Sequence, residues 1–146
     1  MAIDTSREGW WTGDSGADIP AYLRAFSADQ YPVRRAGLAA CRGCGSDRFA
    51  VRIDDEEGCA ERACASCGQT VLMFDSADYV EDASFADVAC PCGGETFNVG
   101  GGFALRDDGE VHWVYVGLRC TRDGVLGCYA DWKIDYSPTA HLFDRV

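Results

Sequence analysis

The sequence has few of the features that mark membrane proteins and secreted proteins. No stretch of its 146 residues comes near the run of about 18 apolar residues that a membrane-spanning helix needs. The first residues contain acids and no apolar run, so they do not resemble a secretory signal. We therefore expect a cytoplasmic protein with no membrane contact.

The chain also lacks the residue patterns of common catalytic sites. It has no G-x-S-x-G nucleophile turn, no phosphate-binding loop and no dinucleotide-binding glycine pattern. Hydrolytic zinc sites normally use histidine and carboxylate ligands, and only His112 and His141 are present. Packing and surface roles are expected for these two residues. We predict that the protein is not an enzyme and find no sign of a small-molecule substrate.

Basic residues are scarce, and this limits the partners that the chain can bind. Acids outnumber bases 24 to 13, which gives a net charge of −11. Because affinity for phosphate comes from lysine and arginine, nucleic acid is a poor default partner and a basic protein suits this field better. Arginines do gather between residues 34 and 62 and would form a local basic face, but the acids at 54–57 weaken it.

Nine cysteines are the strongest positive signal. The number is odd and no export signal precedes them, which favours metal binding over a disulfide framework. Two C-x2-C-G turns stand out, and their cysteines are Cys41, Cys44, Cys64 and Cys67. A glycine after each turn relieves strain where the chain bends sharply. Two such turns held side by side offer four thiolates in a tetrahedron, which predicts a structural Zn2+ site.

A second copy of this unit follows. The alignment places Cys44 over Cys92, Phe49 over Phe97 and, after eight extra residues, Cys64 over Cys120. Such self-similarity is typical of diverged repeats. Each copy has roughly 45 residues, too few to fold securely on apolar burial alone, so bound ions would stabilise both.

The predicted second zinc site is less regular than the first. Its predicted ligands are Cys90, Cys92, Cys120 and Asp123. Asp123 takes the place of Cys67, and carboxylate is an acceptable zinc ligand. Cys128 competes with it, because thiolate is softer, but a regular strand would carry Cys128 away from the ion unless a bulge at Gly127 returned it. We favour Asp123; a second site that holds no metal is the third alternative. Cys59 fits no turn and is interpreted as a small, half-buried apolar residue.

The paired turns resemble the zinc ribbon over roughly residues 41–75. This resemblance implies a small three-stranded antiparallel sheet with a metal ion at one end. Rubredoxins share the paired turn and bind iron, but they place an aromatic residue directly after the first turn, where this chain has Ser46. We therefore expect a mainly β fold: two tandem zinc-ribbon-like, three-stranded antiparallel sheets with a short N-terminal helix. The expected parts are an arm and helix (1–40), a first ribbon (41–80) and a larger second unit with a tail (81–146).

Residue patterns place the elements of these parts. An apolar face predicts a helix over 19–28, capped by Asp18, and Trp10 and Trp11 are expected to dock the arm. Alternation and turn residues predict strands near 49–53, 71–74, 97–105, 110–120 and 125–134. Glycines 100–102 are expected to interrupt one strand as a bulge or to permit a close backbone approach. Residues 75–89 are expected to form a solvated connector.

Together these features predict a non-catalytic zinc-binding interaction protein. Its acidic surface would bind a basic protein partner, for example as an inhibitor or immunity protein that covers the cationic active site of a toxin. The alternative is a nucleic-acid-associated zinc-ribbon factor of transcription or translation, supported by the resemblance and by the arginines at 34–62.

Overall fold

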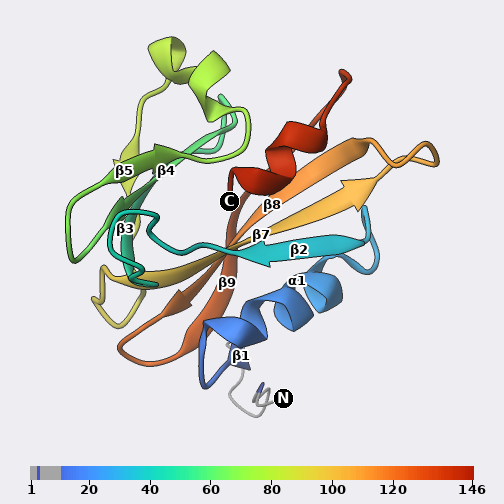
Figure 1. The fold of residues 1–146 in the computed structure, drawn as a ribbon. Coiled ribbons are helices and arrows are strands. Elements are labelled where there is room, and N and C mark those ends of the chain that lie inside the picture. The colour runs from blue at the N-terminus through green and yellow to red at the C-terminus, as the bar shows by residue number, and fades with distance from the viewer. Residues whose placement is uncertain (1–2, 4–10) are drawn as a thin grey trace.

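The computed structural model describes Ile3 and residues 11–146 and shows a mainly β protein with one short α-helix. The nine strands of the described residues lie in one open antiparallel sheet (Figure 1). The strands are β1 (Trp11–Thr12), β2 (Arg35–Leu38), β3 (Phe49–Asp54), β4 (Cys59–Cys64), β5 (Thr70–Leu72), β6 (Ala86–Asp87), β7 (Phe97–Leu105), β8 (Val111–Cys120) and β9 (Val125–Lys133). The helices are α1 (Ile19–Ser27) and the short 3-10 helices η1 (Gly16–Asp18), η2 (Ser76–Asp78), η3 (Val80–Asp82) and η4 (Ala140–Asp144).

Two three-stranded meanders make up most of the sheet. Strands β3, β4 and β5 pair in order, and so do β7, β8 and β9. Their registers correspond, because Phe49 lies opposite Cys64 in the first meander and Phe97 lies opposite Cys120 in the second. The two meanders meet where Phe49 pairs with Phe97, the same two residues that the repeat alignment superimposes. The two predicted small sheets are therefore joined edge to edge.

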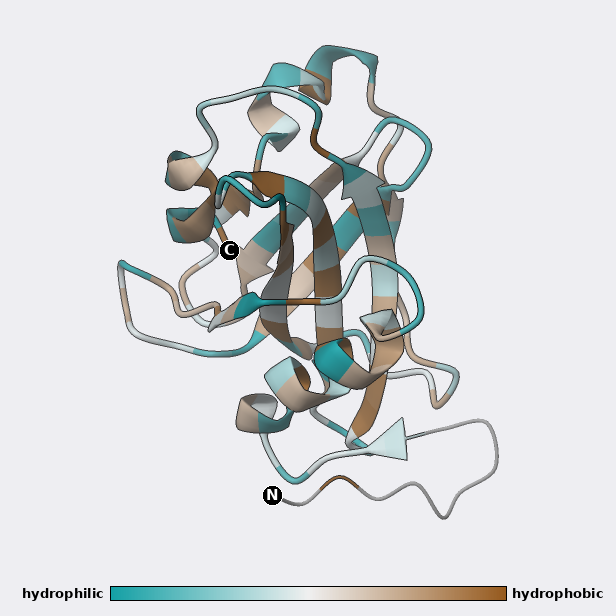
Figure 2. Cartoon of the chain, turned by 90° about the vertical axis from the view of Figure 1, so that its right-hand side faces the viewer, coloured by the Kyte–Doolittle hydropathy of each residue, from teal (hydrophilic) through white to brown (hydrophobic). Residues whose placement is uncertain are grey.

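One hydrophobic core extends across this junction. Phe49 and Phe97 are fully buried and belong to the same cluster as Leu118 of β8 and Leu142 of the tail. In β3 the buried and exposed residues alternate, as the sequence pattern predicts. Figure 2 shows hydrophobic and hydrophilic bands that alternate along several of the strands. A shared interior is what joins the two repeats into one body.

Helix α1 packs closely on the glycine-rich part of the sheet. Strand β7 runs without interruption from 97 to 105, so the predicted break at the glycines is wrong and the close backbone approach is what the structure has. Gly100 lies opposite Gly117, and a Cβ on either would come within 2.7 Å of Ile19 Cγ2. Asp18 precedes the helix but makes no side-chain cap for α1; its carboxylate instead accepts hydrogen bonds from the N–H groups of Asp14 and Ser15, as part of the capping box of η1. Trp11 packs edge-on against Tyr22 of the helix, whereas Trp10 lies outside the described residues.

The connector between the meanders is not simply solvated. It contains η2, η3 and β6, and its first residues, Asp75 and Ser76, are buried. The Asp75 carboxylate accepts hydrogen bonds from Trp132 Nε1 (3.0 Å) and from the Tyr136 hydroxyl (2.9 Å). These bonds tie the start of the connector to the end of β9.

None of the helices in the described part of the chain has the length and apolar character that crossing a membrane requires.

Candidate metal centres

The four cysteine turns share two backbone features. The glycine that follows each turn has a positive φ, between 78° and 91°, a conformation that only glycine adopts without strain. Its N–H donates back to the carbonyl of the first residue of the turn: Gly45 to Cys41 (2.7 Å), Gly68 to Cys64 (2.9 Å), Gly93 to Cys90 (2.8 Å) and Gly124 to Cys120 (2.8 Å). The shorter turn at Cys90 closes with a bond of the same kind that spans three residues, whereas the bonds of the other turns span four.

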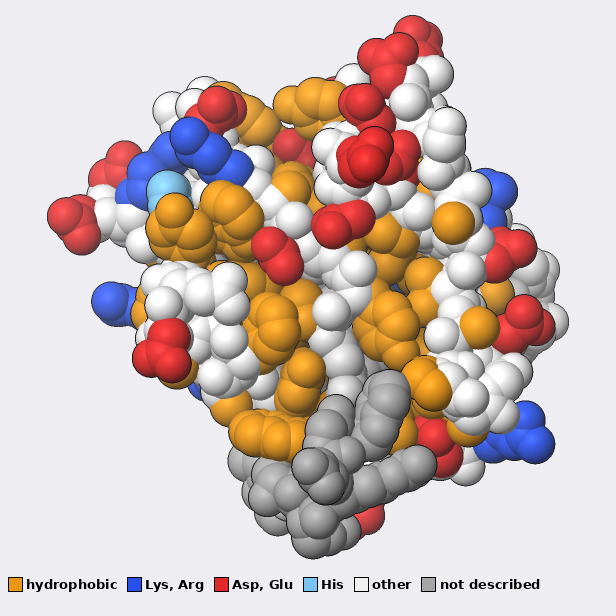
Figure 3. Space-filling view, turned by 180° about the vertical axis from the view of Figure 1, so that it is seen from behind, with side chains coloured by type: hydrophobic (Ala, Val, Ile, Leu, Met, Phe, Trp, Pro, Cys, Tyr) orange, Lys and Arg blue, Asp and Glu red, His pale blue; other side chains and the backbone are white. Residues whose placement is uncertain are grey.

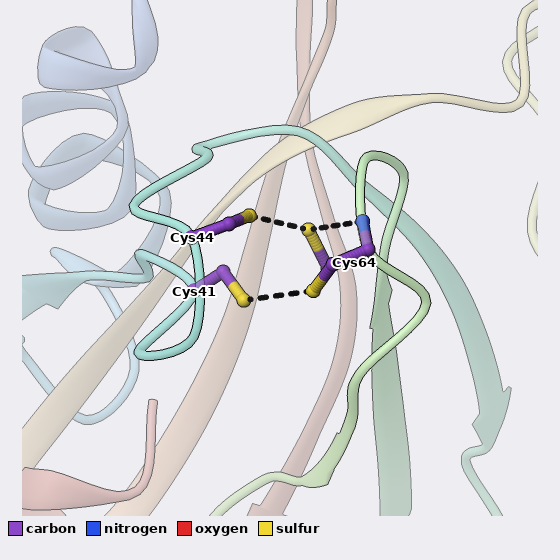
Figure 4. A group of neighbouring side chains, drawn as sticks. Cys41, Cys44 and Cys64 are labelled. Carbon is purple, nitrogen blue, oxygen red and sulfur yellow. Dashed lines mark hydrogen bonds between the residues drawn. The ribbon is translucent and has the colours of Figure 1, made fainter.

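The first pair of turns brings four thiols together (Figure 4). Cys41 Sγ lies 3.5 Å from Cys67 Sγ, and Cys44 Sγ lies 3.5 Å from Cys64 Sγ. All four sulfurs lie within 4.8 Å of one another. Sulfurs that bind one Zn2+ at about 2.3 Å in a tetrahedron are about 3.8 Å apart. The spacing thus fits a single tetrahedral ion, and it is far longer than a disulfide bond.

Backbone amides favour the ionised form of two of these thiols. The N–H groups of Cys67 and Ser66 point at Cys64 Sγ, at 3.5 and 3.4 Å. Chiefly through the Cys67 amide, they lower the pKa of Cys64 to about 6. The Cys44 amide likewise lowers the pKa of Cys41. Since thiolate is the form that binds metal, the turns prepare these sulfurs for a cation.

The second pair of turns gathers three thiols and one carboxylate. Cys90 Sγ lies 3.6 Å from both carboxylate oxygens of Asp123, and Cys92 Sγ lies 3.7 Å from Cys120 Sγ. The four ligand atoms lie within 4.8 Å of one another. Burial raises the pKa of Cys90 to about 12. Burial also acts to raise the pKa of Asp123, but hydrogen bonds, first among them the one from the Val125 N–H (3.0 Å), leave it below its ordinary value.

Cys128 lies apart from this second cluster. Among the described residues, the group whose ligand atoms converge includes Asp123 and not Cys128. The ladder between β8 and β9 does bulge, because Val116 lies opposite Ala130 and Gly117 lies opposite Cys128, with Tyr129 between them. The thiol of Cys128 nevertheless donates to the Ala130 carbonyl and packs with the cluster beneath α1. The bulge does not return it to the other cysteines.

The remaining candidates have structural contacts. Cys59 is fully buried, deeper than the half-buried position predicted for it, and its thiol donates to the Ser76 carbonyl. His112 packs edge-on against Tyr31, and His141 is exposed in η4. One neighbour of the first cluster was not predicted: the Cys41 thiol lies 3.3 Å from Gln69 Oε1. In the sequence, only the position of Gln69 two residues after Cys67 could have indicated this contact.

The arginines between residues 34 and 62 do not all present free charge. Arg62 is buried and donates to the Val146 oxygen, and Arg52 pairs with Glu61 at 2.9 Å. Arg42 donates to the Asp144 carbonyl, and the Arg35 guanidinium lies 3.9 Å from the centre of the Phe143 ring. Several of these side chains thus hold the C-terminal tail or a neighbouring strand, which weakens the basic face that the sequence suggested.

Comparison of the chain with protein families, with curated proteins and with solved structures gives no match. The two clusters can each hold a metal ion, and this conclusion comes from their geometry alone.

Proposed function

We propose that the chain is a non-catalytic zinc-binding interaction protein, built as two tandem ribbon-like units, whose acidic surface binds a basic protein partner. The observation that carries the metal assignment is the convergence of two four-ligand groups with sulfur spacings of 3.5 to 3.7 Å. Thiolate-rich tetrahedral sites suit Zn2+. The matching registers of the two meanders support the tandem arrangement.

A structural role for the ions follows from how each ligand set is completed. Four thiolates fill the coordination sphere of the first ion, and three thiolates with Asp123 fill that of the second. A catalytic zinc keeps one position open for water or substrate, and neither set provides one. The ions would instead fix the ends of the two meanders.

The partner is inferred from charge. The net charge is −11. Zinc binding makes it more negative, because the thiolates that form around each ion carry more negative charge than the two positive charges that the ion adds. A cationic protein surface is complementary to this field, and electrostatic steering would give rapid, salt-sensitive association. Inhibition of a toxin with a cationic active site is one role of this kind.

Partner recovery followed by reconstitution tests the proposal. The zinc-loaded chain is immobilised, extracts are passed over it at about 50 mM and about 500 mM salt, and any recovered protein is purified and titrated against it. We expect a protein of high pI whose Kd weakens as salt rises. Recovery of nucleic acid without protein would favour the alternative role, and the absence of a partner at low salt would contradict the proposal.

A further inference from the structure

Two adjoining hollows form one groove on the face that carries α1 and β9. One has a volume of about 370 Å³ and the other of about 310 Å³. They share the lining residues Tyr22 and Leu126, so they adjoin, and we call them together the edge groove. Its lining includes the rings of Trp11, Tyr22 and Phe26 on one side and residues 125–129 of β9 on the other.

The edge groove follows the outer edge of β9. Five consecutive residues, Val125 to Tyr129, line it, and side chains that alternate between two faces can all do so only along an edge. Strand β1 pairs with β9 only at Val125 and Leu126, and among the described residues no other strand pairs on that side. An edge on which the described residues place no further strand, beside an apolar groove, is suited to an added, extended segment.

Aromatic rings line the groove. Trp11 and Tyr22 meet edge to face at 5.7 Å, and Tyr22 lies 6.1 Å from Phe26. Phe26 is 38% exposed, one of the few large apolar side chains that reach the surface. No acidic or basic side chain occurs among the described lining residues. The walls therefore offer ring faces, to which a cation is attracted by the ring quadrupole.

Negative charge flanks the groove at both ends of its β9 wall. At one end the Asp123 carboxylate accepts from the N–H of Val125, and it belongs to a cluster that keeps net negative charge around a divalent ion. At the other end Asp131 lies two residues past Tyr129, and its N–H is bound by the Asp55 carboxylate. The nearby Arg122 donates to the Cys92 carbonyl. Figure 3 shows, on the face of the molecule seen from behind, hydrophobic side chains with acidic side chains among and beside them.

We propose that the edge groove is the docking site of the basic protein partner, which lays an extended segment along β9 and places an arginine or lysine side chain against the aromatic rings. This inference rests on the proposed function and adds its location and chemistry. The aromatic walls and the flanking acids together select a segment that is both apolar and cationic. An uncharged segment would lose the ring–cation attraction and the interaction with Asp123 and Asp131.

A pair of matched peptides tests the inference without knowledge of the partner. One is an acetylated, amidated Val-Arg-Val-Arg-Val peptide, and the other replaces both arginines with citrulline, which has nearly the same shape and no charge. Each is titrated into the zinc-loaded full chain and followed by amide chemical shifts. We expect shifts at Tyr22 and along 125–129, and binding of the arginine peptide at least about threefold tighter than that of the citrulline peptide.

Two single substitutions distinguish binding in the edge groove from general attraction between the basic peptide and the acidic chain. Tyr22→Leu keeps an apolar side chain and removes one ring, and we expect it to weaken the arginine peptide about threefold or more. Tyr31→Leu removes a ring that stacks on Trp113 outside the groove, and binding should stay unchanged. Equal binding of both peptides, or shifts confined to the acidic turn at 54–57, would overturn the inference. If a recovered partner bound the Tyr22→Leu variant with unchanged affinity, the edge groove would not be its docking site, and the proposed function would still stand.

Discussion

Asp123 holds in the second cluster the position that Cys67 holds in the first, and a substitution tests its role. Asp123→Ala should lower the metal content by one ion per chain, because three thiolates alone leave the ion incompletely bound. Cys128→Ala is the matched control and should keep the full metal content, since its thiol bonds to the Ala130 carbonyl. Metal analysis of the purified variants checks both. Loss of an ion from Cys128→Ala with none from Asp123→Ala would reverse the assignment.

The Cys128 thiol also gives a test at the residue scale that depends on pH. Burial, with Asp131 nearby, raises its pKa to about 12, well above that of a free thiol at about 8.5. Because thiolate is the reactive form, a free thiol becomes mostly ionised by about pH 9 while Cys128 stays protonated. In the zinc-loaded protein, the rate of alkylation of Cys128 by iodoacetamide should therefore still rise about tenfold per pH unit at pH 9, whereas the rate for added glutathione levels off as its thiol becomes fully ionised. A rate for Cys128 that levels off near pH 9 would contradict this pKa.

Gly100 tests the close approach of α1 to the sheet. Gly100→Ala places a Cβ 2.7 Å from Ile19 Cγ2, and we expect the free energy of unfolding to fall by about 1–3 kcal/mol. Gly37→Ala is the control, because its Cβ would meet Val146 Cγ2 at an ordinary 3.5 Å, and it should change stability by less than about 1 kcal/mol. Urea unfolding measures both. Equal effects would show that the helix can move away at little cost.

At the scale of elements, the connector is held to β9 by Asp75. Asp75→Ala leaves the Trp132 N–H and the Tyr136 hydroxyl without their acceptor, which should cost about 2 kcal/mol of unfolding free energy. Asp78→Ala, at an exposed neighbouring site, should change stability by less than about 0.5 kcal/mol. Denaturant unfolding of the two variants compares them. If both had the same small effect, the connector would be held by other contacts.

Local pattern predicted those elements whose structure is set by nearby residues. The helix begins at Ile19 as its apolar face indicates, and the turns at the cysteines lie where the residues predict them. The eight candidate ligands converge because spacing and the repeat define each turn. Asp75 escaped prediction because its partners lie 57 and 61 residues away, and sequence alone shows only an acid in a polar stretch.

At the scale of the whole molecule, pairing between the two repeats means that neither depends only on its own apolar burial for stability. Each repeat alone is small, but the Phe49–Phe97 pairing places both in one sheet over one core. The pairing itself could not be predicted, since it depends on a long-range contact between two strand ends. The repeat alignment had already marked these two phenylalanines as equivalent, and in the structure they face each other.

The central claim is that both clusters hold zinc through reduced cysteines, and native mass spectrometry of the purified chain tests it most directly. The account predicts two Zn2+ ions per chain with every cysteine reduced. It further predicts one ion in Cys44→Ser, one in Cys92→Ser and none in the double variant. A chain that carries no zinc, or whose mass shows the clustered cysteines bridged as disulfides, would contradict the account.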